Sequence, residues 1–165
     1  MLQPVRRSTW APVGRTPVHD AWDRRDRLSV LSALTVSPQR RRVGLFFDAW
    51  GLNITAAEVL VMLRFLRRRF PGGYLLVLDR WQVHRSAVKR LLTRAAKVEV
   101  EWLPPYAPDL NPVEQVWQRG KHVDLPNFIP EHAEHLRLEV EHSIDAMSRQ
   151  QPILRSFFAW AGLQL

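Results

Sequence analysis

The sequence has 165 residues, a length that suits one domain and is sufficient to bury a hydrophobic core. It carries 24 Lys and Arg against 16 Asp and Glu, a net charge of +8 that favours a polyanionic partner such as nucleic acid, with general solubility as the competing interpretation. Cysteine is absent, which excludes disulfides, thiolate zinc sites and a cysteine nucleophile, and no apolar run indicates a signal peptide or a membrane span.

The start of the chain predicts a pair of strands. Residues 1–27 are rich in Pro, Arg and Asp and predict an irregular or edge segment. Apolar residues then alternate with polar ones over 28–36, and a second apolar run covers 42–48. Because a Ser37-Pro38 turn separates the two runs, we expect an antiparallel pair of strands.

A helix and a third strand are predicted next. Asn53 or Thr55 can cap a helix that Pro71-Gly72-Gly73 ends. Its apolar residues recur at helical spacing: Val59, Leu60, Met62, Leu63, Leu66 and Phe70. The continuous apolar run of residues 74–78 predicts a buried strand, and Asp79 stands where that strand stops.

The remaining elements follow the same alternation of helices and strands. Ser86 can cap a helix with Val88, Leu91, Leu92 and Ala95 on one face, and residues 98–103 alternate in the manner of a half-exposed strand. Trp117 is expected to enter the core. We also expect a helix over 130–149 and a short one over 152–162, whose aromatic residues Phe157, Phe158 and Trp160 pack back on the body.

Two carboxylates are candidates for a metal site. Asp79 ends a strand, and Glu114 lies on the first turn of a helix after a proline-rich loop. The interval between them can hold a helix and another strand, so both acids can reach one edge of a single sheet. Taken singly, a strand-end Asp is most often a turn residue and a helix-start Glu most often complements the helix dipole. Their combination favours a site for Mg²⁺, which prefers carboxylate oxygens.

Three segments resemble the catalytic domain of DDE transposases of bacterial insertion sequences in the Tc/mariner superfamily. They are LDRWQVH at 78–84, LPPYAPDLNPVEQVW at 103–117 and RSTWAPVGRTPV at 7–18. The resemblance implies an α/β, RNase H-like mixed sheet of the retroviral-integrase type, flanked by helices and lacking its first strand. It implies one domain over residues 1–165, with its core over 28–122 and C-terminal helices over 123–165.

The resemblance also implies a chemistry. The family cleaves phosphodiesters and transfers strands at transposon ends with two Mg²⁺ or Mn²⁺ ions. Asp79 would bridge both ions and Glu114 would hold one. The implied partners are the DNA of transposon ends and target and an upstream helix-turn-helix region. The implied location is the bacterial cytoplasm, at the nucleoid.

The first acid of the family is not matched. It lies shortly before the segment at 7–18, where this chain has no acid, and we expect it from an upstream polypeptide or a longer start. Four other acids lie on the wrong side of that segment: Asp20, Asp23, Asp26 and Asp48. We therefore expect the lone chain to be inactive. The alternatives are a decayed fragment that binds DNA without cutting it and, more weakly, another nuclease on the same fold. Lacking a central strand would leave an open sheet edge, which predicts self-association, with a homodimer as one form.

Other residues have two interpretations each. His84 can touch a phosphate or orient a ligand, or it can cap the next helix. Asn111 is expected to cap the Glu114 helix, with Pro112 in its first turn, and so to aim the carboxylate. Tyr106, with the neighbouring prolines, can form a wall beside the substrate, while packing over the sheet end is the alternative for Pro104 and Pro105.

Two basic clusters complete the candidates. Arg64, Arg67, Arg68 and Arg69 on the first helix can follow a DNA backbone, and so can the hairpin turn with Arg40 and Arg41. A solvated helix face and a solvated turn explain the same residues.

Overall fold

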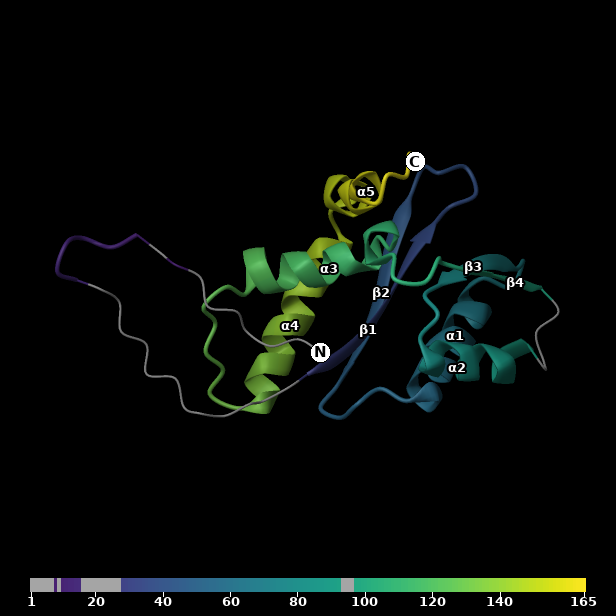
Figure 1. Ribbon diagram of the computed structural model, residues 1–165, viewed down its shortest axis with the longest axis horizontal. Helices are drawn as coiled ribbons and strands as arrows, with labels where there is room; N and C mark the ends of the chain where they lie inside the picture. Colours follow the sequence, from purple (N-terminus) through teal and green to yellow (C-terminus); the bar gives the residue numbers. More distant parts are fainter. Residues whose placement is uncertain (1–7, 9, 16–27, 93–96) are drawn as a thin grey trace.

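The structure is a computed structural model that describes residues 8, 10–15, 28–92 and 97–165. Asp20, Asp23, Asp26 and most of the predicted irregular segment 1–27 lie outside these residues, as does Ala95. Figure 1 shows a hairpin of strands crossing the middle of the molecule, with helices on one side of it and a further helix-and-strand unit on the other.

The central pair is the predicted antiparallel hairpin. β1 (Ser29–Val36) pairs with β2 (Val43–Trp50), in a register that runs from Ser29 opposite Trp50 to Val36 opposite Val43. The side-chain oxygen of Ser37 closes the turn by accepting hydrogen bonds from the backbone N–H groups of Arg41 and Arg42 at 3.1 and 3.0 Å. The hydroxyl thus replaces strand hydrogen bonds that the turn cannot make.

The second unit is a parallel strand pair with two helices. α1 (Ala56–Arg69) leads into β3 (Tyr74–Leu78), and α2 (Gln82–Leu92) connects β3 to β4 (Val98–Trp102). A core cluster lies between the helices and the strands, formed by Val59, Leu60, Leu63, Leu76, Ala87, Val88 and Leu91. Gly73 has a φ of 102°, and a Cβ there would lie 2.6 Å from the carbonyl oxygen of Lys97. Only glycine allows the two strands to approach at this point.

The remaining helices pack against the hairpin. They are the 3₁₀ turn η1 (Pro108–Leu110), α3 (Val113–Arg119), the π-helical turn η2 (Gly120–Asp124), α4 (Ala133–Ser148) and α5 (Gln151–Trp160). With β1 and β2 they enclose a second core cluster, whose most buried members include Val116, Val140, Ile144, Met147 and Leu154. Trp117 is partly buried against it, as predicted.

The predicted mixed α/β class is confirmed, and its described strands form two two-stranded sheets, β1–β2 antiparallel and β3–β4 parallel. Other expectations require correction. β3 is not a buried strand: helices cover one face only, so Leu76 is buried while Leu75 and Val77 are 56% and 52% exposed. Trp160 is 76% exposed because it lies outside the arc of α5 that Leu154, Phe157 and Phe158 occupy.

The start of α2 was also predicted wrongly. The helix begins at Gln82, so Ser86 lies inside it and does not cap it. The first helical hydrogen bond runs from the Arg85 N–H to the Trp81 carbonyl, at 3.1 Å. None of the helices that the structure describes is long and apolar enough to cross a membrane.

Candidate metal centre

Asp79 stands directly after β3, where the chain turns towards α2. Its Oδ1 accepts a hydrogen bond from the backbone N–H of Trp81 at 3.0 Å and contacts Nδ1 of His84 at 2.6 Å. The side chain is 45% exposed, and Oδ2 has no hydrogen-bond partner among the residues described. One carboxylate oxygen is therefore held in place by the protein, while the other is accessible to a cation.

His84 reaches Asp79 from the first turn of α2. A carboxylate only accepts hydrogen bonds, so Nδ1 carries the proton that it donates to Asp79. The imidazole is only 13% exposed, and the Trp81 ring meets it edge-on with the ring centres 5.2 Å apart. Of the interpretations left open for this residue, the contact favours orientation of the Asp79 carboxylate over capping of the helix.

Glu114 lies on the first turn of α3, on a segment that Asn111 organises. The Asn111 side chain accepts a hydrogen bond from the Val113 N–H at 3.2 Å, and its carbonyl accepts one from the Glu114 N–H at 3.0 Å. The prediction is wrong by one residue, because Pro112 is the N-cap of α3 and the Asn111 side chain supports the turn just before the helix. These bonds fix the backbone from which the Glu114 side chain projects.

The electrostatics show that the two acids share one region. Burial raises the pKa of the Glu114 carboxyl above its ordinary value of 4.5, and the negative charge of Asp79 raises it further, whereas Lys121 lowers it. Glu114 is half-buried, so its charge is poorly solvated. A cation between the two carboxylates would relieve both the burial of charge and the repulsion.

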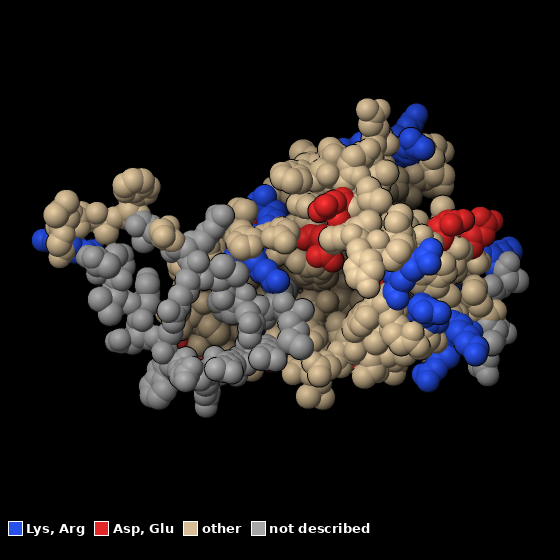
Figure 2. Space-filling view, viewed as in Figure 1, with Lys and Arg blue, Asp and Glu red and all other residues tan. Residues whose placement is uncertain are grey.

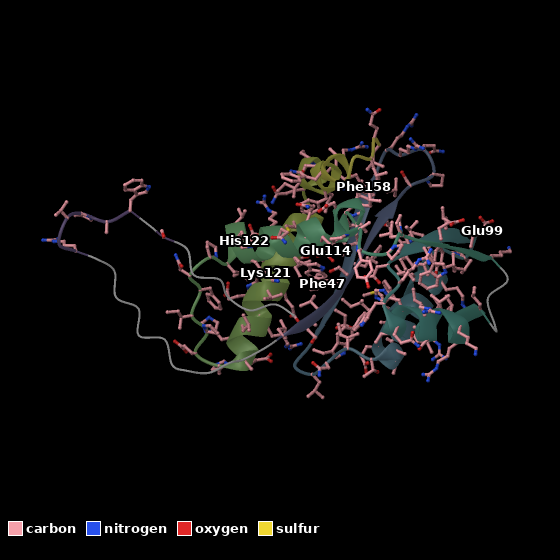
Figure 3. The ribbon with its side chains drawn as sticks, viewed as in Figure 1. Phe47, Glu99, Glu114, Lys121, His122 and Phe158 are labelled. Atoms are coloured by element: carbon pink, nitrogen blue, oxygen red, sulfur yellow. The ribbon has the colours of Figure 1, made fainter. Side chains whose placement is uncertain are left out.

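Lys121 was missed by the sequence reasoning. It follows Glu114 by seven residues, which is two helical turns and therefore the same helix face, so the spacing could have revealed it. Figure 3 shows Glu114 and Lys121 on the continuous stretch of ribbon that α3 and η2 form.

The ligand atoms are of the type that a divalent cation prefers, but few residues supply them. Asp79 and Glu114 supply hard carboxylate oxygens, the ligands that Mg²⁺ and Mn²⁺ prefer. Within the described part of the chain, however, no group of three or more His, Asp or Glu side chains gathers as metal ligands. The residues present therefore fit two of the three acids of the complete site that the resemblance implies.

Asp48 does not complete this pair. It is exposed on β2, and its Oδ1 accepts a hydrogen bond from the backbone N–H of Ala49 at 2.9 Å. The pKa of Arg137 on α4 is raised by its hydrogen bond to Glu134, and by smaller contributions from Glu141 and Asp48. The dismissal of Asp48 as a substitute for the first acid stays a prediction.

The remaining candidates are Tyr106 and the two basic clusters. Tyr106 is fully exposed with a φ of 57°, and its predicted contact with substrate stays a prediction. Arg40 and Arg41 lie at the turn between β1 and β2, where Arg155 of α5 donates hydrogen bonds to their carbonyl oxygens at 2.7 and 2.9 Å. Three arginines of α1 line a separate cleft: Arg64, Arg67 and Arg68.

The comparisons with known proteins converge on one group. A family model described as DDE superfamily endonuclease matches residues 1–133. No curated protein matches the sequence significantly.

Solved structures of the Mos1 transposase share the fold. The Mos1 mariner paired end complex with Mn matches with a TM-score of 0.64 at 17% identity, covering 98% of this chain and 49% of that one. The Mos1 strand transfer complex matches with a TM-score of 0.61 at 16% identity, covering 96% and 48%. The chain thus spans about half the length of these relatives and has their RNase H-like α/β fold.

Proposed function

Because this chain belongs to the DDE superfamily endonucleases, we propose that it is the catalytic domain, over residues 1–165, of a transposase of a bacterial insertion sequence. Its reaction is metal-dependent cleavage and strand transfer at the ends of the element. The observation that carries the proposal is the electrostatic coupling of Asp79 and Glu114. The two acids come from distant parts of the sequence, and the charge of Asp79 adds to burial in disfavouring the charged form of Glu114, an arrangement that a divalent cation would stabilise.

Two residues would bind the cation, and their neighbours hold them in position. Asp79 offers its exposed Oδ2 to a cation, while His84 and the Trp81 N–H hold Oδ1. Glu114 offers the second carboxylate from a backbone that Asn111 fixes. Bound Mg²⁺ or Mn²⁺, two ions in the complete site, supplies activation of the attacking oxygen and stabilisation of the leaving one. His84 is a positioning residue, since it acts through Asp79.

The partners follow from the same assignment. The Mos1 structures are named as paired-end and strand transfer complexes, one of them with the left transposon end, which supports DNA as the partner of this chain. The net charge of +8 agrees with a polyanion. We further propose that the active protein takes its first acid and a helix-turn-helix region from an upstream polypeptide. We also propose that it is a homodimer and acts at the nucleoid in the cytoplasm.

A second candidate function is DNA binding without catalysis. It is favoured by the metal-ligand set, which among the described residues comprises two acids rather than three. In that case the chain is a decayed transposase fragment that binds DNA through its basic surface. The two functions differ in whether an added first acid restores cutting.

A cleavage assay on plasmid DNA in Mg²⁺ or Mn²⁺ tests the proposal. The 165-residue chain is compared with a version extended upstream to include the first acid, and with Asp79→Ala and Glu114→Ala in the extended version. We expect cutting by the extended protein only, and its loss in both substitutions. His84→Ala should lower activity by about 10- to 100-fold, the usual effect of removing a residue that orients a ligand.

The matched control is Glu99→Ala. Glu99 is an exposed carboxylate on β4, and Figure 3 shows it at the far margin of the molecule from Glu114. Its removal changes the net charge as the test substitutions do and should leave cutting intact. Cutting that survives Asp79→Ala contradicts the proposed site. An extended protein that binds DNA but never cuts it supports the decayed fragment instead.

A further inference from the structure

A cleft between α1 and α2 is lined almost entirely by arginine. It has a volume of about 420 Å³, and the described residues around it are Arg64, Arg67, Arg68, Arg90 and Leu91. Leu91 is 2% exposed and the four arginines are exposed. Figure 2 shows Lys and Arg side chains gathered over the part of the molecule that α1 and α2 occupy in Figure 1. Sequence reasoning found the three arginines of α1 but missed Arg90, which only packing of the helices brings to them.

The core beneath the cleft holds the two helices together. Leu63 of α1 and Ala87, Val88 and Leu91 of α2 are buried in one cluster. The arginines stand on the solvent side of this contact, so their backbones are fixed while their long side chains can adjust. Such a site is built by the fold rather than by a flexible loop.

Local roles account for single arginines but not for the group. Arg67 and Arg68 lie in the last turn of α1, where positive charge complements the helix dipole. Nε of Arg68 donates a hydrogen bond to the Arg64 carbonyl at 3.4 Å. Neither role requires Arg90 from another helix. Four like charges around one cleft repel each other, and a bound anion would reduce that repulsion.

The chemistry of the group selects its ligand. A guanidinium is planar, always charged and suited to paired hydrogen bonds with phosphate oxygens. We propose that the cleft binds the phosphate backbone of duplex DNA at a distance from the cutting site. The inference rests on the proposed function and extends it. Arg90 lies six residues beyond His84 on α2, about 9 Å along the helix axis and about a third of a turn around it, so the cleft would hold DNA on another face of the helix from Asp79.

A DNA-binding assay tests the proposed role of the cleft. It measures the affinity of the full chain for a fluorescent duplex of about 30 base pairs, at several salt concentrations and without metal. In the double variant Arg68→Ala with Arg90→Ala, affinity should fall about tenfold, and the slope of log affinity against log salt should flatten by about 2. The matched control is Arg69→Ala with Lys89→Ala. It removes the same charge from the neighbouring positions, which do not line the cleft, and should change affinity less than about twofold. Circular dichroism and Tm verify that all variants fold.

The outcomes separate this inference from the proposed function. Equal loss of DNA affinity in both double variants would mean that only net charge matters, and would overturn the proposal that the cleft binds DNA. A parent chain that binds no duplex would overturn it as well. The parent chain could instead bind polyglutamate more tightly than duplex DNA and lose that binding in the cleft variant. This result would assign the cleft to an acidic protein and overturn the proposal that it binds DNA. Cleft-dependent DNA binding by an extended protein that never cuts would instead overturn the proposed catalysis alone. If the cleft variant of the extended protein cuts and binds DNA like its parent, only the proposal about the cleft is overturned.

Discussion

At the scale of single residues, Glu114 is under opposed demands. Its half-buried position and the nearby Asp79 both disfavour its negative charge, yet a metal ligand must be ionised. Lys121 offsets part of this cost by favouring the ionised form. The fold therefore keeps at this position a carboxylate that is unfavourable for stability in the absence of a cation, which is a common property of functional sites.

The first prediction concerns Glu114→Gln. A raised pKa means that the folded state holds the proton more tightly, so this group favours folding most below its ordinary pKa of 4.5, and stability is lost as the pH rises through the raised value. At pH 7 without metal, the neutral variant should therefore have a higher Tm than the parent. This difference in Tm should disappear at a pH below 4.5, where the Glu114 side chain of the parent is protonated and therefore uncharged, as the glutamine of the variant is. Thermal melts at the two pH values measure this.

Divalent cation provides the control for that prediction. Added Mg²⁺ or Mn²⁺ should raise the Tm of the parent more than that of Glu114→Gln, since binding to the folded state alone stabilises it. A variant that is less stable than the parent at pH 7 would show that the carboxylate makes a favourable contact instead.

The places of the two acids at the end of a strand and the start of a helix could be predicted because each has a local signature, whereas their role as metal ligands stays a prediction. Asp79 ends an apolar run, and Glu114 follows an Asn-Pro pair. The role of His84 could not be decided, since a spacing of five residues is compatible with several directions of the side chain. The early start of α2 is what brings it to Asp79. Arg90 and the rest of the cleft depend on how α1 packs against α2, which no local pattern contains.

At the scale of elements, the start of α1 is defined by a capping box. The Thr55 side chain accepts a hydrogen bond from the Ala57 N–H at 3.2 Å, and Glu58 accepts one from the Thr55 N–H at 2.7 Å. These bonds serve backbone donors that the first turn leaves without partners. Because α1 precedes β3 and carries three arginines of the cleft, its stability supports both sites.

The second prediction is that Thr55→Ala lowers the free energy of unfolding by about 1 kcal/mol at pH 7, whereas Thr55→Ser stays near the parent. The hydrogen bond from Thr55 lowers the pKa of Glu58, helped by backbone N–H groups. Its stabilising effect is therefore present above the ordinary pKa of 4.5 and is lost as the pH falls through the lowered value. The cost of Thr55→Ala should shrink over that range. Urea unfolding at several pH values measures it, and a pH-independent cost would contradict the role of Glu58.

The elements were largely predictable because their apolar patterns are strong. The hairpin, α1, β4, α4 and α5 lie close to where periodicity places them. The burial of β3 was not predictable in this way. Its unbroken apolar run indicates two covered faces, but coverage depends on partners elsewhere in the fold. In the structure only the face towards α1 and α2 is covered, and Leu75 and Val77 face outwards.

At the scale of the whole molecule, the two acids belong to different cores. Asp79 follows β3, which packs with α1 and α2, whereas Glu114 lies on α3, which packs against the hairpin through Val116. Leu31 of β1 packs against the core of β3, although its strand belongs to the other unit. The distance between the carboxylates therefore depends on how the two units are held together, which is a property that sequence patterns within either unit do not contain.

The last prediction concerns the open strands. β1 pairs only with β2, and β3 only with β4, among the described strands, so each strand has an edge with unpaired backbone groups. The exposed Leu75 and Val77 make the open face of β3 beside that edge apolar as well. We expect the chain to self-associate through this edge, with an average mass that rises with concentration in size-exclusion chromatography with light scattering.

A charge on β3 should weaken that association, because lysine on an edge strand opposes pairing with another chain. Val77→Lys should raise the dissociation constant by about fivefold, corresponding to the ~1 kcal/mol by which strand positions discriminate between residues. Leu52→Lys is the matched control, since Leu52 is 82% exposed and lies between β2 and α1, outside any strand. Equal effects of the two substitutions would assign the association to general surface hydrophobicity, and a monomeric parent at all concentrations would show that the β3 edge is not used. An effect of Val77→Lys alone would identify β3, the strand that positions Asp79, as the site where a second chain joins the fold.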